Sequence, residues 1–138
     1  MSYEPSLIAA ERTEDYGKLI LRLALGGLIL FHGVAKLTGG IGFIADVVAK
    51  AGLPSFVAYG VYVGEVVAPV LLIAGWYSRI AAAVIAINMV FAIALVHVPE
   101  LFTLNGSGGW ALELQGMFLF TAVAVALLGP GRFSINRR

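Results

Sequence analysis

The chain has no cysteine among its 138 residues. This absence excludes a disulfide framework, a CxxC dithiol, a thiolate metal site and a cysteine nucleophile. We expect no redox cofactor intrinsic to the chain, so any redox chemistry would need a bound electron donor or a partner protein.

Charged residues are scarce, at 12% of the chain, and nine basic against eight acidic residues leave a formal net charge of +1. Basic stretches that would neutralise nucleic-acid phosphates are missing. P-loop, dinucleotide-binding, nucleophile-elbow and haem-attachment motifs are missing too. Ala68 and Gly116 stand where the Glu-x-x-His pattern of di-iron bundles requires histidine. The sequence therefore predicts neither a nucleic-acid partner nor a metal site.

Apolar residues make up 60% of the chain, and the mean hydropathy is +0.95. They form four runs of 18 to 21 residues, at 19–37, 57–77, 80–97 and 111–128. Each run matches the ~20 residues that cross a bilayer as a helix. We expect an all-α fold, an integral membrane four-helix bundle with up-and-down topology, in direct contact with membrane lipid.

The first run carries acidic residues before it and no small-residue cleavage site after it, which favours a retained helix over a signal peptide. We expect a flexible cytoplasmic N-terminal tail at 1–15, a membrane domain at 16–134 and a cytoplasmic C-terminal tail at 135–138. Glycine-rich helix faces are compatible with a homodimer.

The basic residues are distributed unevenly between the two sides of this topology. Lys36 and Lys50 fall on one side, and the larger group falls on the other: Arg12, Lys18, Arg22, Arg79, Arg132, Arg137 and Arg138. The positive-inside rule then places both termini in the cytoplasm. On the outer side, apolar residues at helical spacing within 38–56 predict a short amphipathic helix in the membrane interface.

Polar residues within the runs are concentrated in the outer half of the bundle. They are His32 and Lys36 in the first run, Glu65 in the second, His97 in the third, and Glu113 and Gln115 in the fourth, where Glu113 is the residue we expect to face inward. Ionisable groups in hydrocarbon cost at least about 2.5 kcal/mol on insertion scales, so each needs a partner or a water-filled cavity.

Two interpretations of these polar residues are open. In the first, Glu65 with Lys36, or Glu113 with His32, form buried ion pairs that only fix helix order. In the second, they form a binding site, and Pro69 supports this by kinking the helix one turn after Glu65. Arg22 is expected to extend to the lipid headgroups.

The chain resembles the DoxX family of small four-helix membrane proteins over about residues 16–134. The matching features are Leu21-Arg22-Leu23, Phe31-His32-Gly33, Lys36-Leu37, Gly52-Leu53-Pro54, Glu65, Arg79, His97, the turn from Asn105-Gly106 to Gly109-Trp110, Glu113, and Gly129-Pro130-Gly131-Arg132-Phe133. The resemblance implies a bacterial or archaeal inner-membrane protein related to subunits of quinone-linked oxidoreductases, including thiosulfate:quinone oxidoreductase.

On this basis we expect a membrane subunit that binds a quinone or a similar amphipathic molecule in the outer-leaflet polar pocket. Glu65 and Glu113 would relay protons, while His32, Lys36, His97 and Trp110 would contact the substrate, and a protein partner would supply electrons. The alternatives are a scaffold or assembly subunit without catalysis and, ranked last, a small transporter.

Overall fold

The structure, a computed structural model, describes residues 5–137, and in this part of the chain regular structure is helical. The first helix, α1, spans Pro5–Gly39 and is followed by the short helix α2, Gly42–Lys50. The next helical segment is built from η1 (Ser55–Tyr59), α3 (Gly60–Tyr62), η2 (Val63–Val67) and α4 (Ala68–Ala74). The last elements are α5 (Ser78–Ala92), η3 (Ile93–His97), η4 (Val98–Glu100) and α6 (Glu113–Leu128).

Three helical segments of the described chain are long and apolar enough to cross a membrane, namely Pro5–Gly39, Ser55–Ala74 and Ser78–Glu100. The expected fourth run is helical over only 16 residues, because α6 begins at Glu113. For the described residues, the all-α fold with three helices long and apolar enough to span a membrane is therefore confirmed. The fourth span, the up-and-down four-helix bundle and the amphipathic, interfacial character of α2 stay predictions.

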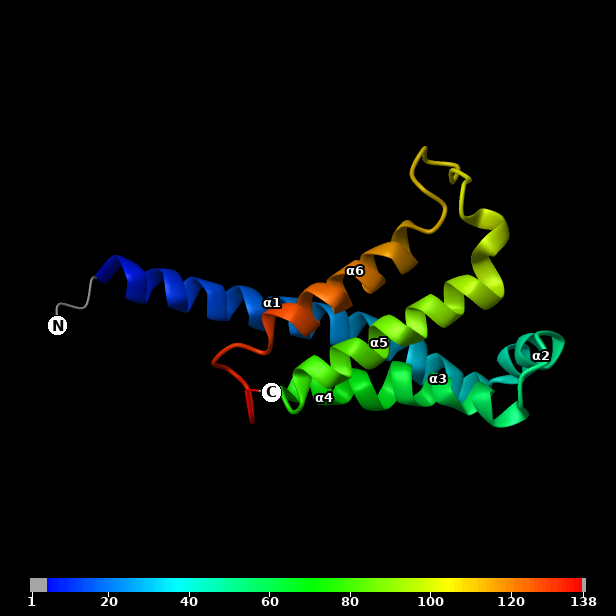
Figure 1. The fold of residues 1–138 in the computed structure, drawn as a ribbon, viewed down its shortest axis with the longest axis horizontal. Coiled ribbons are helices and arrows are strands. Elements are labelled where there is room, and N and C mark those ends of the chain that lie inside the picture. The colour runs from blue at the N-terminus through cyan, green and yellow to red at the C-terminus, as the bar shows by residue number, and fades with distance from the viewer. Residues whose placement is uncertain (1–4, 138) are drawn as a thin grey trace.

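The long helices run side by side along the length of the molecule, with α1 against α4 and α6, and α5 against α4 and α6 (Figure 1). Their contact surfaces form one buried core of small and branched side chains: Leu25, Ile29, Ala68, Leu72, Ala81, Ala82, Ile85, Met89, Phe118, Ala122 and Val125. Large apolar side chains also cover the outside, where Phe31 is 76% and Phe120 is 65% exposed. A surface of this kind suits lipid rather than water.

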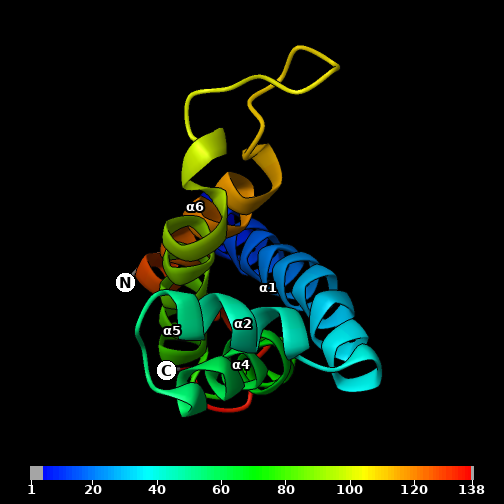
Figure 2. The same ribbon diagram turned by 90° about the vertical axis from the view of Figure 1, so that its right-hand side faces the viewer.

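One end of the bundle carries α2 and the 101–112 loop (Figure 1). The other end carries the segment that follows α6, residues 129–137, which is called the C-terminal tail from here on. Seen along the bundle, α2 lies across its end, and the loop extends sideways beyond the helices (Figure 2). The functional residues expected in the outer leaflet lie toward the α2 end.

The helix that contains Glu65 has a widened π-helical turn at Val63–Val67, just before Pro69. Proline has no N–H to donate to the carbonyl four residues earlier, which is that of Glu65. The expected distortion is thus present as a π turn. Gly33 of α1 packs against this carbonyl so closely that a Cβ at Gly33 would collide with it.

The expectation that Arg22 extends to the lipid headgroups is wrong. Its side chain is only 1% exposed, and it donates hydrogen bonds to four carbonyl oxygens, those of Leu72 (2.9 Å), Ile73 (3.0 Å), Pro130 (2.9 Å) and Phe133 (2.7 Å). Two of these carbonyls, those of Leu72 and Ile73, lie in the last turn of α4, and that of Leu72 also accepts the backbone N–H of Gly75 at 3.1 Å. Arg22 therefore fastens the C-terminal tail and the end of α4 to α1.

Arg79, in the first turn of α5, caps the C-terminal end of α6 in the same way. Its Nη1 donates to the carbonyl oxygens of Ala126 (3.0 Å) and Leu127 (2.6 Å). Both arginines place a positive charge at the C-terminal end of a helix, which also suits the helix dipole.

The segments expected as terminal tails are partly ordered by contacts. Helix α1 continues without a break from the membrane domain back to Pro5, and the ring of Tyr16 stacks on Phe133 at 5.1 Å. The backbone N–H of Ile135 donates to the carbonyl of Gly75 at 3.0 Å. The mobility of residues 1–15 stays a prediction, and residues 1–4 and Arg138 lie outside the described chain.

Candidate functional site

A cavity of about 620 Å³ lies among α1, α2, the η2 turn, α5 with η3, and the start of α6. Most of its walls are apolar side chains, including Ile29, Val48 and Met89. The polar side chains that line it are His32, Lys36, Glu65, Asn88, His97 and Gln115. A mostly apolar cavity with a few convergent polar groups is typical of sites for small molecules.

Lys36 and Glu65 form an ion pair on one side of this cavity, with 2.5 Å between Nζ and Oε2. The Glu65 side chain is 9% exposed and that of Lys36 is 24% exposed. Lys36 is the cation that neutralises this carboxylate. The structure confirms the pairing of these two residues that the sequence suggested as one alternative.

The π turn explains how a carboxylate on the second membrane helix reaches the end of the first. A π turn changes the angular spacing of the side chains that follow, and such turns are frequent at functional sites. Just before the π turn on the same helical segment, the hydroxyl of Tyr62 donates to the carbonyl of Lys36 at 3.4 Å, close to the C-terminus of α1. Backbone and side-chain contacts therefore hold the same two segments together.

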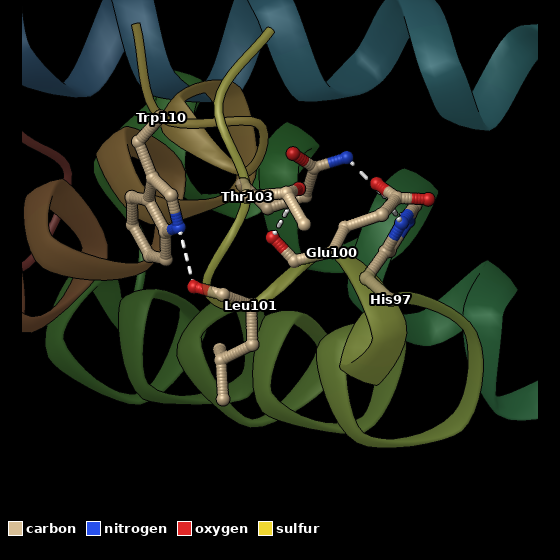
Figure 3. Close-up of polar contacts among 6 residues, drawn as sticks. His97, Glu100, Leu101, Thr103 and Trp110 are labelled. Carbon is tan, nitrogen blue, oxygen red and sulfur yellow. Dashed lines mark hydrogen bonds and ion pairs between the residues drawn. The ribbon is translucent and has the colours of Figure 1, made fainter.

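A second polar group lies on the side of the cavity formed by η3 and α6. Nε2 of His97 is 3.5 Å from Nε2 of Gln115. Nδ1 of the same ring is 3.4 Å from Oε2 of Glu100, and Figure 3 shows these two side chains together. Two nitrogens cannot bond unless one accepts, so either the ring tautomer or the orientation of the amide decides this contact. His97 thus connects the cavity to Glu100, whose side chain is half exposed.

His32 lines the cavity from α1, and its ring meets the ring of Phe118 edge to face at 5.9 Å. The alternative pairing of His32 with Glu113 does not occur in the described chain, because Glu113 accepts a hydrogen bond from Nδ2 of Asn105 at 3.1 Å.

Glu113 and Trp110 belong to the 101–112 loop and its junction with α6, and neither lines the cavity. Nε1 of Trp110 donates to the carbonyl of Leu101 at 2.8 Å (Figure 3). Asn105 also accepts from the N–H groups of two residues of the turn, Ser107 and Gly109, at 3.0 Å each. The loop is therefore closed by its own hydrogen bonds.

Of the six residues predicted as a site, the structure brings four together, namely His32, Lys36, Glu65 and His97. Gln115 and Asn88 take part as well, although the sequence analysis assigned them no site role. Asn88 packs on the helix beside Glu65, because a Cβ at Gly64 would lie 2.5 Å from the Asn88 amide carbon. The position of Asn88 near the middle of an apolar helix was the sequence signal that could have assigned it to the site.

Within residues 5–137, no three metal-binding side chains of the histidine, cysteine or carboxylate type lie close enough to hold an ion. The cavity instead offers an ammonium, a carboxylate, two imidazoles and two amides. This set can donate hydrogen bonds to carbonyl oxygens and exchange protons with a bound molecule.

Long apolar helices with a lipid-compatible exterior define a helical membrane protein. A family model described as DoxX matches residues 17–98, and the chain belongs to the DoxX family. It is 31% identical over 115 residues to "Putative oxidoreductase CatD" of Bacillus subtilis, covering 83% of this chain and 81% of that protein.

A second relative, an "Uncharacterized protein" of Haemophilus influenzae, is 29% identical over 121 residues, covering 80% of this chain and 84% of that protein. No solved structure matches the chain. The family and one relative's name thus suggest a link between this membrane protein and oxidoreductases.

Proposed function

We propose that this chain is the membrane subunit of a quinone-linked oxidoreductase system and binds a quinone or a similar amphipathic molecule in the cavity. The observation that carries the proposal is a cavity of about 620 Å³ with mostly apolar walls and the Lys36–Glu65 ion pair on one side. The volume lies within the range of about 300–1,000 Å³ typical of small-molecule sites. The name of the Bacillus subtilis relative also supports an oxidoreductase connection.

The proposal includes a complete membrane arrangement. Helix α6 has 16 residues, about 24 Å at ~1.5 Å per residue, and we assign it as a fourth span slightly shorter than the bilayer core. The excess of lysine and arginine at the end opposite α2 favours both termini in the cytoplasm. The protein then resides in the inner membrane of a bacterium or archaeon, and its cavity opens in the outer leaflet.

In this arrangement a quinone enters sideways from the lipid, with its tail against apolar walls. Its carbonyl oxygens accept hydrogen bonds from the Lys36 ammonium and from His32 or His97. Reduction of a quinone to the hydroquinone consumes two electrons and two protons. The two electrons come from a reduced partner protein, and Glu65 relays the two protons, one after the other, from water to the quinone oxygens. Glu113 and Trp110 lie outside the cavity and take no part in this step.

A scaffold or assembly subunit is the second candidate, and the ion pair itself favours it. Lys36 and Glu65 satisfy each other, which is what a pair with a purely structural role would do. The two candidates differ in one respect, because only the first requires a ligand in the cavity.

Titration of the detergent-purified protein with a short-chain quinone, followed by calorimetry, separates them. We expect saturable binding that Glu65→Gln weakens at least tenfold, while Glu113→Gln, which removes a carboxylate outside the cavity, leaves it unchanged. Asn88→Ala adds a cavity variant that keeps the ion pair and should also weaken binding. Absence of binding by folded wild-type protein, or equal effects of Glu65→Gln and Glu113→Gln, would support the scaffold.

A further inference from the structure

The start of α1 and the C-terminal tail lie at the end of the molecule opposite α2 (Figure 1). A second crevice, of about 400 Å³, lies between them. It is lined by one apolar and several charged residues: Ile8, Glu11, Arg12, Asp15, Gly131, Arg132 and Arg137. None of these residues contributes to the cavity of the proposed function.

The crevice has three guanidinium groups with no ion-pair partner. Within residues 5–137, Arg12, Arg132 and Arg137 have no carboxylate within 4.0 Å. Asp15 is nearby, but its Oδ1 accepts the backbone N–H of Arg132 at 3.1 Å. Three positive and two negative side chains line the crevice, which leaves an excess of one positive charge.

The depth of the crevice matches the lipid headgroups. The apolar run of α1 begins at residue 19, and the α1 residues of the crevice lie 4 to 11 residues before it. At ~1.5 Å per residue, Asp15 and the backbone of Arg132 that is bonded to it lie about 6 Å outside the hydrocarbon, in the headgroup layer. Arg12 lies one turn farther out, and its long side chain can extend back to that layer. The stacked pair Tyr16 and Phe133 lies between, at the depth of an interfacial aromatic belt.

We propose that this crevice binds the headgroup of an anionic phospholipid of the phosphatidylglycerol type. Guanidinium groups bind phosphate oxygens with two parallel hydrogen bonds, so Arg12, Arg132 and Arg137 form the phosphate site. The carboxylate of Glu11, one turn farther from the hydrocarbon than Asp15, accepts from the glycerol hydroxyls of the headgroup. The lipid then joins the start of α1 to the C-terminal tail. This inference does not depend on the proposed function.

Native mass spectrometry of the delipidated full-length protein tests the site, with equimolar phosphatidylglycerol, phosphatidylethanolamine and phosphatidylcholine in detergent. We expect one phosphatidylglycerol to be retained in preference to the other two. Each basic residue near a membrane surface contributes about 1 kcal/mol, so Arg12→Gln or Arg132→Gln should weaken retention about fivefold and the double variant about thirtyfold.

Lys50→Gln is the matched control, because it removes one positive charge from the α2 end and should leave retention unchanged. Circular dichroism confirms that each variant is folded. Equal retention of the three lipids, preference for phosphatidylethanolamine, or an equal loss in Lys50→Gln would overturn the proposal. Competition by millimolar glycerol 3-phosphate as effective as that by the lipid would also overturn it, since the site would then recognise a soluble phosphate.

Discussion

The ion pair between Lys36 and Glu65 should stabilise the fold only while both partners are present. In Lys36→Met, the Glu65 carboxylate, whose side chain is 9% exposed, loses the cation that lies 2.5 Å away. Removal of one partner from a buried pair costs about 3–5 kcal/mol, because a buried charge is left uncompensated. We expect Lys36→Met to lower the free energy of unfolding by an amount near the lower end of that range, since the cavity beside the pair can admit water.

Substitution of the other partner, Glu65, should reduce the free energy of unfolding by less. In Glu65→Gln the remaining charge is on Lys36, whose side chain is 24% exposed and flexible enough to turn toward water. We expect a loss of about 1–3 kcal/mol for this variant. The double variant removes both charges and should lie within about 1 kcal/mol of the wild type, because neutral replacement of buried pairs is often nearly without cost.

The four proteins form a double-mutant cycle. Unfolding free energies are measured in mixed micelles by titration with a denaturing detergent, followed by circular dichroism. We predict a coupling energy of at least about 2 kcal/mol, and Glu113→Gln combined with Lys36→Met should show none. Additive losses for the Lys36 and Glu65 substitutions would refute the reasoning, since they would mean that the pair is absent in the folded protein.

Three further contacts are tested by substitution, two of them with a matched comparison variant. Gly33→Ala should destabilise the bundle by more than about 2 kcal/mol, because its Cβ would collide with the facing backbone, while Gly27→Ala, in open space, should be neutral or stabilising by up to about 1 kcal/mol. Arg22→Met should cost about 3 kcal/mol or more because it leaves buried carbonyls unpaired, and Arg79→Gln should cost less. Asn105→Ala should speed amide hydrogen exchange in the 101–112 loop and leave the bundle unchanged.

Each of these has a result that would contradict it. Equal melting temperatures for the two glycine variants would show that α1 and the π turn are not in close contact. If Arg79→Gln lowered the free energy of unfolding as much as Arg22→Met, burial of the arginine would not determine the size of the effect. Faster exchange throughout α6 in Asn105→Ala would show that the loop and the helix unfold together.

Hydrophobic run length predicted most of the fold, because apolar runs of 18 residues or more form few structures other than membrane-spanning helices. It could not locate the start of α6, which depends on the hydrogen bonds of the preceding loop. Since α6 begins at Glu113, that side chain lies beside the loop and Gln115 enters the cavity. The rotation of a helix about its axis is set by contacts that are distant in sequence.

Arg22 illustrates a second limit. An arginine one turn inside an apolar run can extend to headgroups or bond to carbonyls, and both satisfy its charge. The structure selects the second because the tail residues Pro130 and Phe133 return to α1. By contrast, Lys36 and Glu65 could be paired from sequence, since two opposite charges at similar depth in hydrocarbon have few other partners.

The most direct test of the central proposal is to locate a bound quinone. A photoreactive azidoquinone is cross-linked to the protein in lipid nanodiscs, with and without excess unlabelled quinone, and the labelled peptides are mapped. The proposal predicts labels, lost on competition, on cavity residues such as Ile29, Met89 and Gln115. Labelling that excess quinone does not reduce, or that falls on lipid-facing residues such as Ile80 and Phe120, would contradict it.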